Sequence, residues 1–250
     1  MATIIRRAGC VVCAVGLLFW AGWQVVHAHK QEESTSASVN QQVLPVAYSP
    51  TLDRSTNWLS LGLHHLENGS LQDAEFCLCE HVRDHPKHLR ARALYADLLV
   101  KRRLFTLAEE QYGKCIALEQ DRPNRSLQEE IFWRQRLMQI AQIHGDTYSI
   151  HLHKGIGLYL LSRQQFEKNH DDLEREQLLF GAIRELEWAH LIRPNRAKPC
   201  LYLHLSWKTL GQSLLSNRNL QLARDNAVTG GLTPAEQRHT VSFTVEDFLK

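Results

Sequence analysis

Small residues recur in this chain at positions where pairs of helices would touch, and this repetition limits the possible folds more than any other feature. Ala74 follows Gly62 after twelve residues, and Ala108 follows Ala74 after 34 residues. The apolar residues around them recur every three or four positions, which is the period of an amphipathic helix. A helical repeat of this length predicts a stacked array, in which each unit buries its apolar face against its neighbours.

Two units carry the pattern most clearly. The first has Trp58 at the start of the segment WLSLGLHH, Gly69 at a turn and Pro86 at its end. The second unit has Ala96 at the position that Gly62 of Leu61-Gly62 holds in the first unit, and Ala108 opens the segment AEEQYGKC. This pattern resembles the tetratricopeptide repeat, whose signature W-x2-L-G-x2-Y recurs with a period of 34 residues. The resemblance implies paired antiparallel helices wound into a right-handed superhelix.

Two further units are predicted at displaced positions. Ile156-Gly157 is interpreted as the Leu-Gly position of a first helix, and Ala182 lies in its partner. The 25 residues between Gly157 and Ala182 exceed the twelve of the first unit, so the charged segment FEKNHDDLEREQ is predicted to be an insertion that extends the hairpin. The last unit is predicted to begin at Trp207, in WKTLGQSL, and to carry Ala223 in its second helix.

The sequence also predicts helices outside the repeat. Ser126 and Glu129 form a capping box at the start of an apolar-periodic stretch that ends at Gly145. Thr233 followed by Pro234 is typical of a helix N-terminus. We therefore expect an all-α fold: a tetratricopeptide-like helical-repeat superhelix of about four helix pairs, with an extra helix and a C-terminal cap, after an N-terminal transmembrane helix.

The N-terminal part is predicted to enter a membrane. Residues 8–26 contain no charged side chain, and a helix of that length spans about 30 Å of hydrocarbon. Arg6 and Arg7 precede this stretch, so the positive-inside rule keeps the N-terminus cytoplasmic and places the rest on the other side. The alternative is a signal peptide cleaved near Ala28, which would leave the domain secreted or periplasmic.

These observations divide the chain into four segments. Residues 1–28 are the membrane anchor or signal peptide, and residues 29–54 are a polar linker rich in Gln, Ser and Thr. Residues 55–232 form the repeat domain, and residues 233–250 form a C-terminal capping segment.

Composition and motifs argue against catalysis and against nucleic-acid binding. A net charge of +2 on 250 residues lacks the basic excess that a nucleic-acid-binding surface requires. The sequence contains no GxxxxGK[ST], HExxH, GxSxG or GxGxxG motif. We therefore expect no enzymatic activity and no cofactor.

One cluster of possible metal ligands provides an alternative. Cys77, Cys79, His81, His85 and His88 lie close together in the sequence, and Cys and His side chains are the usual ligands of zinc and related metals. A metal-handling protein that uses this cluster is therefore one alternative, and a self-associating structural protein is another. His81 occupies an inward repeat position, which favours a role in the core, so no metal ligand is predicted.

The resemblance also implies a binding surface. In tetratricopeptide proteins the first helices line an inner groove, and nine positions here match that register: Leu59, Leu63, Leu66, Arg90, Asp97, Lys101, His151, Lys154 and Leu158. Their apolar and cationic character fits a peptide or helix with apolar and acidic side chains. The predicted function is an exported, membrane-tethered scaffold that binds protein partners and helps to assemble an envelope complex.

Overall fold

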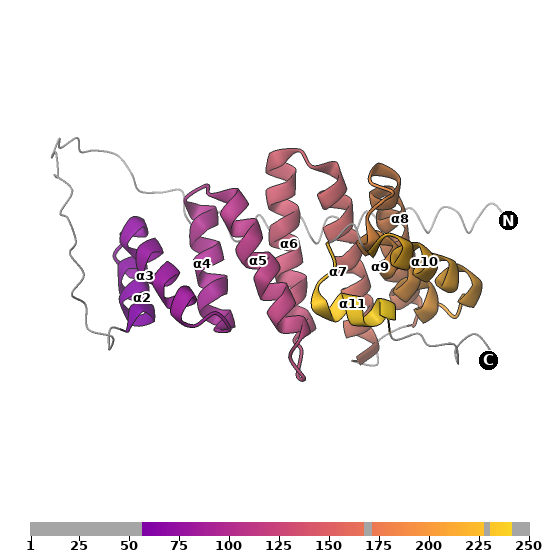
Figure 1. Cartoon of the computed structure of the whole chain (residues 1–250), viewed down its shortest axis with the longest axis horizontal. Coiled ribbons are helices and arrows are strands. Elements are labelled where there is room, and N and C mark those ends of the chain that lie inside the picture. The colour runs from indigo at the N-terminus through magenta and orange to yellow at the C-terminus, as the bar shows by residue number, and fades with distance from the viewer. Residues whose placement is uncertain (1–56, 168–171, 228–230, 242–250) are drawn as a thin grey trace. The chain divides into compact units, whose positions relative to one another are not determined.

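A computed structural model describes residues 57–167, 172–227 and 231–241, which form ten helices and no strand (Figure 1). The helices are α2 (Trp58–Glu67), α3 (Leu71–Asp84), α4 (Leu89–Lys101), α5 (Phe105–Gln120), α6 (Leu127–His144), α7 (Thr147–Glu167), α8 (Asp172–Ile192), α9 (Ala197–Thr209), α10 (Ser213–Asp225) and α11 (Pro234–Val241). The all-α prediction is thus confirmed for these residues. None of these helices combines the length and apolarity needed to cross a membrane. The predicted transmembrane helix and linker lie outside the described residues.

The first two predicted units are confirmed as the helix pairs α2/α3 and α4/α5. Ala74, Ala96 and Ala108 are completely buried where the helices touch. A Cβ atom on Gly62 would lie 3.1 Å from Cγ of Leu78, so α2 approaches α3 as closely as a glycine permits. Small residues at these positions are therefore a requirement of the packing.

The predicted extra helix, α6, connects two hydrophobic cores. Trp133 and Leu137 pack into the core formed with α2 to α5, whereas Leu127 and Ile131 pack into the core formed with α7 to α9. Helix α6 is buried on two sides because α5 and α7 flank it. It therefore extends the array without interruption.

Both predicted helix N-termini are capped, but the capping box predicted from Ser126 and Glu129 is only half formed, because Glu119 takes the place of Glu129. The Ser126 hydroxyl accepts a hydrogen bond from the backbone N–H of Glu129 at 3.3 Å, while Glu119 of α5 accepts from the Ser126 N–H. At α11, Thr233 Oγ1 accepts from the Glu236 N–H at 3.2 Å, and the Glu236 carboxylate accepts from the Thr233 N–H at 2.8 Å. This reciprocal pair is a complete capping box.

The third pair, α7/α8, corrects the predicted register. A Cβ on Gly157 would meet no atom within 4 Å, whereas a Cβ on Gly155 would lie 2.7 Å from Cγ of Leu186 and 3.2 Å from the backbone oxygen of Ala182. The helix contact is therefore at Gly155 and not at Gly157. Because Gly155 lies two residues further from Ala182, the insertion is two residues longer than predicted. Both helices have 21 residues, so the insertion lengthens the hairpin as expected.

The fourth pair, α9/α10, begins earlier than predicted. Its first helix starts at Ala197, and Trp207 lies near that helix's end. Gly211 has a φ of +73° in the turn between the two helices, a left-handed conformation that glycine adopts without steric cost. The Leu-Gly of this segment is therefore a helix-ending signal and not a helix-contact signal. Ala223 is buried in the second helix, as predicted.

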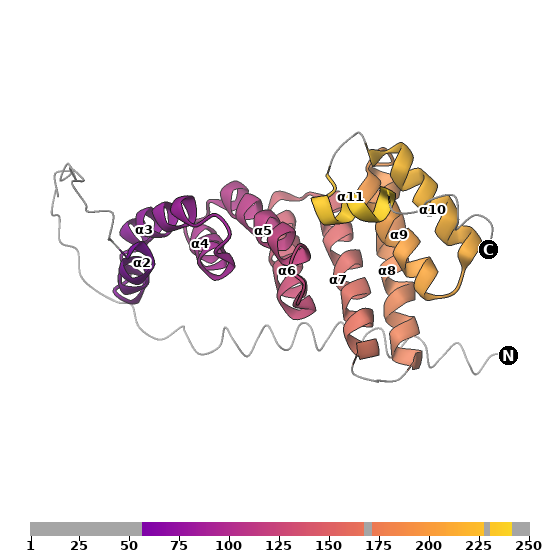
Figure 2. The same cartoon turned by 60° about the horizontal axis from the view of Figure 1, so that its bottom comes forward.

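Helix α11 is the predicted C-terminal cap, but it folds back along the array. In Figures 1 and 2 it lies beside α7 and α9, and it also reaches the end of α5. Thr233 Oγ1 donates to the side-chain oxygen of Gln120 at 2.6 Å, and Arg238 forms an ion pair with Asp121 at 2.6 Å. The C-terminal helix therefore joins early and late parts of the repeat.

A buried ionic cluster holds α11 in this position. The Glu236 carboxylate is 3% exposed and lies 3.0 Å from Lys198 Nζ and 3.5 Å from an Arg134 nitrogen, and it accepts a hydrogen bond from the Tyr202 hydroxyl at 2.9 Å. Burial by itself raises the pKa of Glu236, but Lys198 and Arg134 outweigh it and lower that pKa to about 2. Glu236 is therefore ionised and compensated inside the protein.

Candidate functional site

A groove of about 1020 Å³ lies between the first half of α4, the end of α5 and the first half of α6. It is lined by Lys87, His88, Leu89, Arg90, Ala93, Leu118, Asp121, Arg122, Pro123, Gln128, Glu129, Phe132 and Trp133. The groove exists because α4 and α6 both pack against α5, whose C-terminal end lies between them.

The floor of the groove is apolar. Ala93 of α4, Leu118 of α5 and Trp133 of α6 present carbon surface to it, and Phe132 lies at its edge with 41% of its surface exposed. The guanidinium carbon of Arg136 lies 5.0 Å from the centre of the Phe132 ring, an arrangement that orients an exposed aromatic ring. Apolar surface of this kind suits the anchoring side chains of a protein segment.

The α4 wall carries cations without ionic partners. Lys87 and Arg90 are exposed and form no ion pair with any described residue. Arg122, at the end of α5, differs because it lies 3.0 Å from the buried carboxylate of Glu119. Lys87 and Arg90 are therefore available to an external carboxylate.

The opposite wall carries acidic groups. Glu129, in the first turn of α6, is exposed and forms no ion pair among the described residues. Asp121, at the end of α5, pairs with Arg238 of α11. The free charges of the groove are thus positive on the α4 side and negative on the α6 side.

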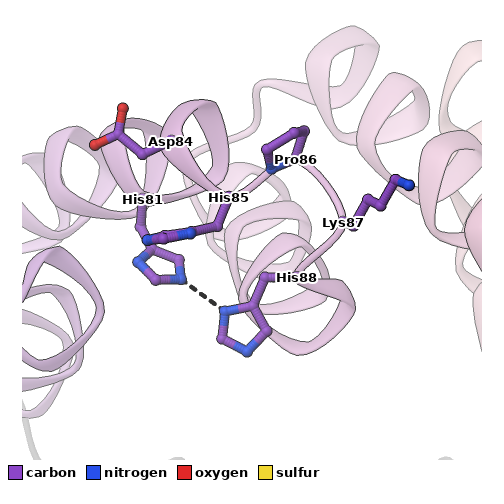
Figure 3. Close-up of a pocket in the computed structure, with 6 residues that line it drawn as sticks. All are labelled: His81, Asp84, His85, Pro86, Lys87 and His88. Atoms are coloured by element: carbon purple, nitrogen blue, oxygen red, sulfur yellow. Dashed lines mark hydrogen bonds between the residues drawn. The ribbon is translucent and has the colours of Figure 1, made fainter.

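A cluster of three histidines adjoins the groove at the turn between α3 and α4 (Figure 3). His81 Nε2 and His88 Nδ1 are 2.6 Å apart and share a hydrogen bond, and the ring centres of His81 and His85 are 4.7 Å apart. Asp84 and Lys87 point away from the rings in Figure 3. Burial, and then the neighbouring His85 and His88, lower the pKa of His81 against the opposing effect of Asp84.

The cysteines do not join this cluster as metal ligands. Cys77 is 2% exposed in the core, where burial and then Asp73 raise the pKa of its thiol. Cys79 is exposed on α3. Within the described ranges, no three His, Cys, Asp or Glu side chains are arranged to hold a metal ion. The position of His81, 9% exposed, agrees with its predicted role in the core.

The histidine cluster predicts a pH-dependent stability. Because the pKa of His81 is lower in the folded protein than its ordinary value of 6.5, the unfolded chain binds the proton first as the pH falls below about 6.5, and stability declines. We expect wild type to lose more thermal stability between pH 7.5 and 5.5 than His81→Gln, in melts followed by circular dichroism. His64→Gln, at an exposed histidine, is the control and should keep the wild-type pH dependence. Equal pH dependence in all three proteins would contradict this expectation.

Of the nine residues predicted to line a groove, Arg90 alone lies in the one described above. Leu59 and Leu66 pack against the first core, while Leu63 is 37% exposed on α2. Lys101 is exposed at the end of α4 and forms no ion pair with described residues. Partner binding by these residues stays a prediction.

The remaining predicted residues make contacts within the fold. His151 and Lys154 of α7 lie 2.8 Å and 2.9 Å from the carboxylate of Glu185 on α8. Leu158 is partly buried against the second core. Asp97 accepts a hydrogen bond from a buried tyrosine hydroxyl of α5 at 2.5 Å. Their polar groups are already partnered inside the chain.

The sequence register missed the α6 wall, with Phe132, Trp133 and Glu129, and the turn that carries Lys87. Phe132 and Trp133 are adjacent in the sequence, and neighbours on a helix point in different directions. One of the two must therefore face away from a single apolar side, and this was the available signal for an exposed aromatic on α6.

No protein-family model matches the sequence, and no curated protein matches it. Among solved structures it is similar to "MamA 41-end from Desulfovibrio magneticus RS-1", with 13% identity, 70% of this chain and 96% of that chain covered, and a TM-score of 0.32. A "MamA RS-1 ArsTM double mutant" gives 13% identity, 69% and 93% coverage, and a TM-score of 0.32. A "Crystal structure of MamA protein" gives 12% identity, with 75% of this chain and 95% of that chain covered, and a TM-score of 0.28.

At such low identities and TM-scores these likenesses carry no argument about function. The class of the protein rests on its own helices. The described residues form an all-helical array of helix pairs, with small buried residues at the pair contacts and a groove between alternate helices.

Proposed function

We propose that this chain is a non-catalytic adaptor that binds a protein partner in the groove between α4 and α6. The partner would present an extended or helical segment with apolar and acidic side chains. The observation that supports this most directly is an apolar floor beside two cations, Lys87 and Arg90, that have no ionic partner among the described residues. Apolar anchors supply most of the affinity of such an interface, and charges set its specificity.

The proposal includes a membrane location and a role in assembling an envelope complex. The membrane location is supported by the uncharged stretch 8–26 and by Arg6 and Arg7 before it. A repeat domain tethered beside a membrane would raise the local concentration of its partner there.

The topology can be measured directly. A reporter fused after Lys250 should be active only on the non-cytoplasmic side, because Arg6 and Arg7 keep the N-terminus cytoplasmic. Reversing these charges with Arg6→Glu/Arg7→Glu should lower the fraction of molecules that insert in that orientation. Activity of the wild-type fusion in the cytoplasm alone would refute the proposed export of the repeat domain.

Site-specific photo-crosslinking tests the groove as a partner-binding site. Ala93→p-benzoyl-phenylalanine places a crosslinker on the groove floor, and we expect it to yield a defined protein adduct in native membranes, identified by mass spectrometry. Gly113→p-benzoyl-phenylalanine is the matched control, because Gly113 is exposed on α5 and is not among the lining residues. The proposed function fails if position 113 gives the same adduct as position 93, or if neither gives one.

Charge reversal separates binding from folding. Lys87→Glu/Arg90→Glu should reduce the adduct at position 93 about tenfold or more, yet change the melting temperature little, since exposed charges contribute under about 1 kcal/mol. Lys114→Glu, at an exposed lysine of α5 whose partner Glu110 is also exposed, should leave the adduct unchanged. Lys154 is unsuitable for this test because its reversal would place a carboxylate against Glu185. An adduct that survives reversal at positions 87 and 90 would remove these cations from the interface.

A further inference from the structure

We infer that the C-terminal segment 242–250 of this chain occupies the groove between α4 and α6 of its own molecule and competes there with the partner. This inference rests on the proposed function, because it assigns a regulator to the same groove. It follows from the charge pattern of the groove, the sequence of the segment and the position at which α11 ends.

The sequence of the segment matches the groove in kind. SFTVEDFLK contains aromatic and aliphatic residues, the adjacent acids Glu246 and Asp247, and Lys250 three residues later. Its apolar side chains suit the floor formed by Ala93, Leu118 and Trp133. Carboxylates brought together with unpaired cations in this way favour binding and fix its direction.

The charges of the two walls give that direction. Lys87 and Arg90 on the α4 wall can receive Glu246 and Asp247, and Glu129 on the α6 wall can receive Lys250. All three groove residues lack an ion pair with any part of the chain that the structure describes. The segment thus offers a charge of the opposite sign for each of them.

An ion pair attaches helix α11, which precedes the segment, to one end of the groove. Arg238 of this helix pairs with Asp121, which lines the groove, and the helix ends three residues later at Val241. Nine extended residues reach about 30 Å, and the segment begins four residues beyond an arginine that pairs with a groove residue. Tethering gives the segment an effective concentration in the millimolar range, so weak contacts suffice to keep the groove filled.

Competition with a labelled peptide tests this inference on the full-length chain. The probe is a fluorescein-labelled peptide of the sequence SFTVEDFLK, measured by anisotropy. We expect it to bind the Glu246→Ala/Asp247→Ala chain about tenfold or more tightly than wild type, because the wild-type groove is already occupied. Adding Lys87→Glu/Arg90→Glu to that chain should abolish binding, and a peptide with lysines in place of its two acids should restore it. Lys114→Glu should have no effect.

Several results would overturn the inference: equal affinity for wild type and for the tail variant, binding that ignores Lys87→Glu/Arg90→Glu, or affinities that fall as the chain concentration rises. The last result would mean that the segment binds a second copy instead.

The photo-crosslink at position 93 separates the two proposals. If the partner adduct forms while the peptide fails to bind, only this inference is lost. If the peptide binds while no partner adduct forms even in the tail variant, the proposed function is lost.

Discussion

Replacing Glu236 with alanine should lower the free energy of unfolding by about 3–5 kcal/mol, which is the cost of removing one partner from a buried ion pair. Lys198 and Arg134 would both remain buried near the gap, where Lys198 would lose its carboxylate partner. Tyr202 would also lose the acceptor of its hydroxyl. Urea denaturation followed by circular dichroism measures the change.

An exposed ion pair of the same helix is the control. Arg238→Ala removes the pair with Asp121, whose side chains are 62% and 48% exposed, and should cost less than about 1 kcal/mol. Glu236→Leu/Lys198→Met removes both charges of the strongest pair and should recover part of the loss, because the uncompensated cation is gone. A cost of Glu236→Ala no larger than that of Arg238→Ala would show that the cluster is not what holds α11.

The loss can also appear as detachment of α11 before the rest unfolds. Helix α11 has only eight residues, so its docking is the least costly part of the domain to lose. In Glu236→Ala we therefore expect faster protease cleavage between α10 and α11 than in wild type. Cleavage at an unchanged rate would contradict the role of Glu236 in docking.

The first two helix pairs could be predicted from sequence because local period and long-range packing agree there. Ala74 and Ala108 are both fully buried at pair contacts, and they are spaced by one repeat. Gly62 is likewise against its partner helix. When the same residue satisfies the helical period and the closest helix contact, the pattern has one consistent interpretation.

The predicted positions of the later pairs were wrong because one motif can serve two physical purposes. The Leu-Gly after Trp207 ends a helix, with Gly211 in a left-handed turn, and the same two letters at Gly62 mark a helix contact. The repeat signature alone does not separate these roles. A glycine immediately before a new helical stretch was the evidence for a turn.

The groove and the return of α11 depend on contacts that no local pattern encodes. Glu236 and Arg134 are 102 residues apart in the sequence, and their pairing follows from where α11 packs. The groove similarly combines the turn before α4, the end of α5 and α6. The family register selects first helices only, so it included Arg90 but not Lys87 or Phe132.

The two glycines of α7 provide the sharpest test of the corrected register. Gly155→Ala should destabilise the domain by about 2 kcal/mol or more, because the new Cβ would lie 2.7 Å from Cγ of Leu186 and 3.2 Å from the backbone oxygen of Ala182. Neither atom is the free end of a flexible side chain, so α7 and α8 must move apart. This effect should exceed the gain in helix propensity of about 1 kcal/mol.

Gly157→Ala is the matched control, because it makes the same change two residues away on the same helix. Successive residues of a helix are about 100° apart, so positions 155 and 157 point to nearly opposite sides. A Cβ at position 157 meets nothing within 4 Å, and the substitution should therefore stabilise the domain by up to about 1 kcal/mol. Denaturation midpoints of the two variants should thus move in opposite directions from wild type. If Gly157→Ala were the destabilising change instead, the contact between α7 and α8 would follow the register first predicted from Ile156-Gly157.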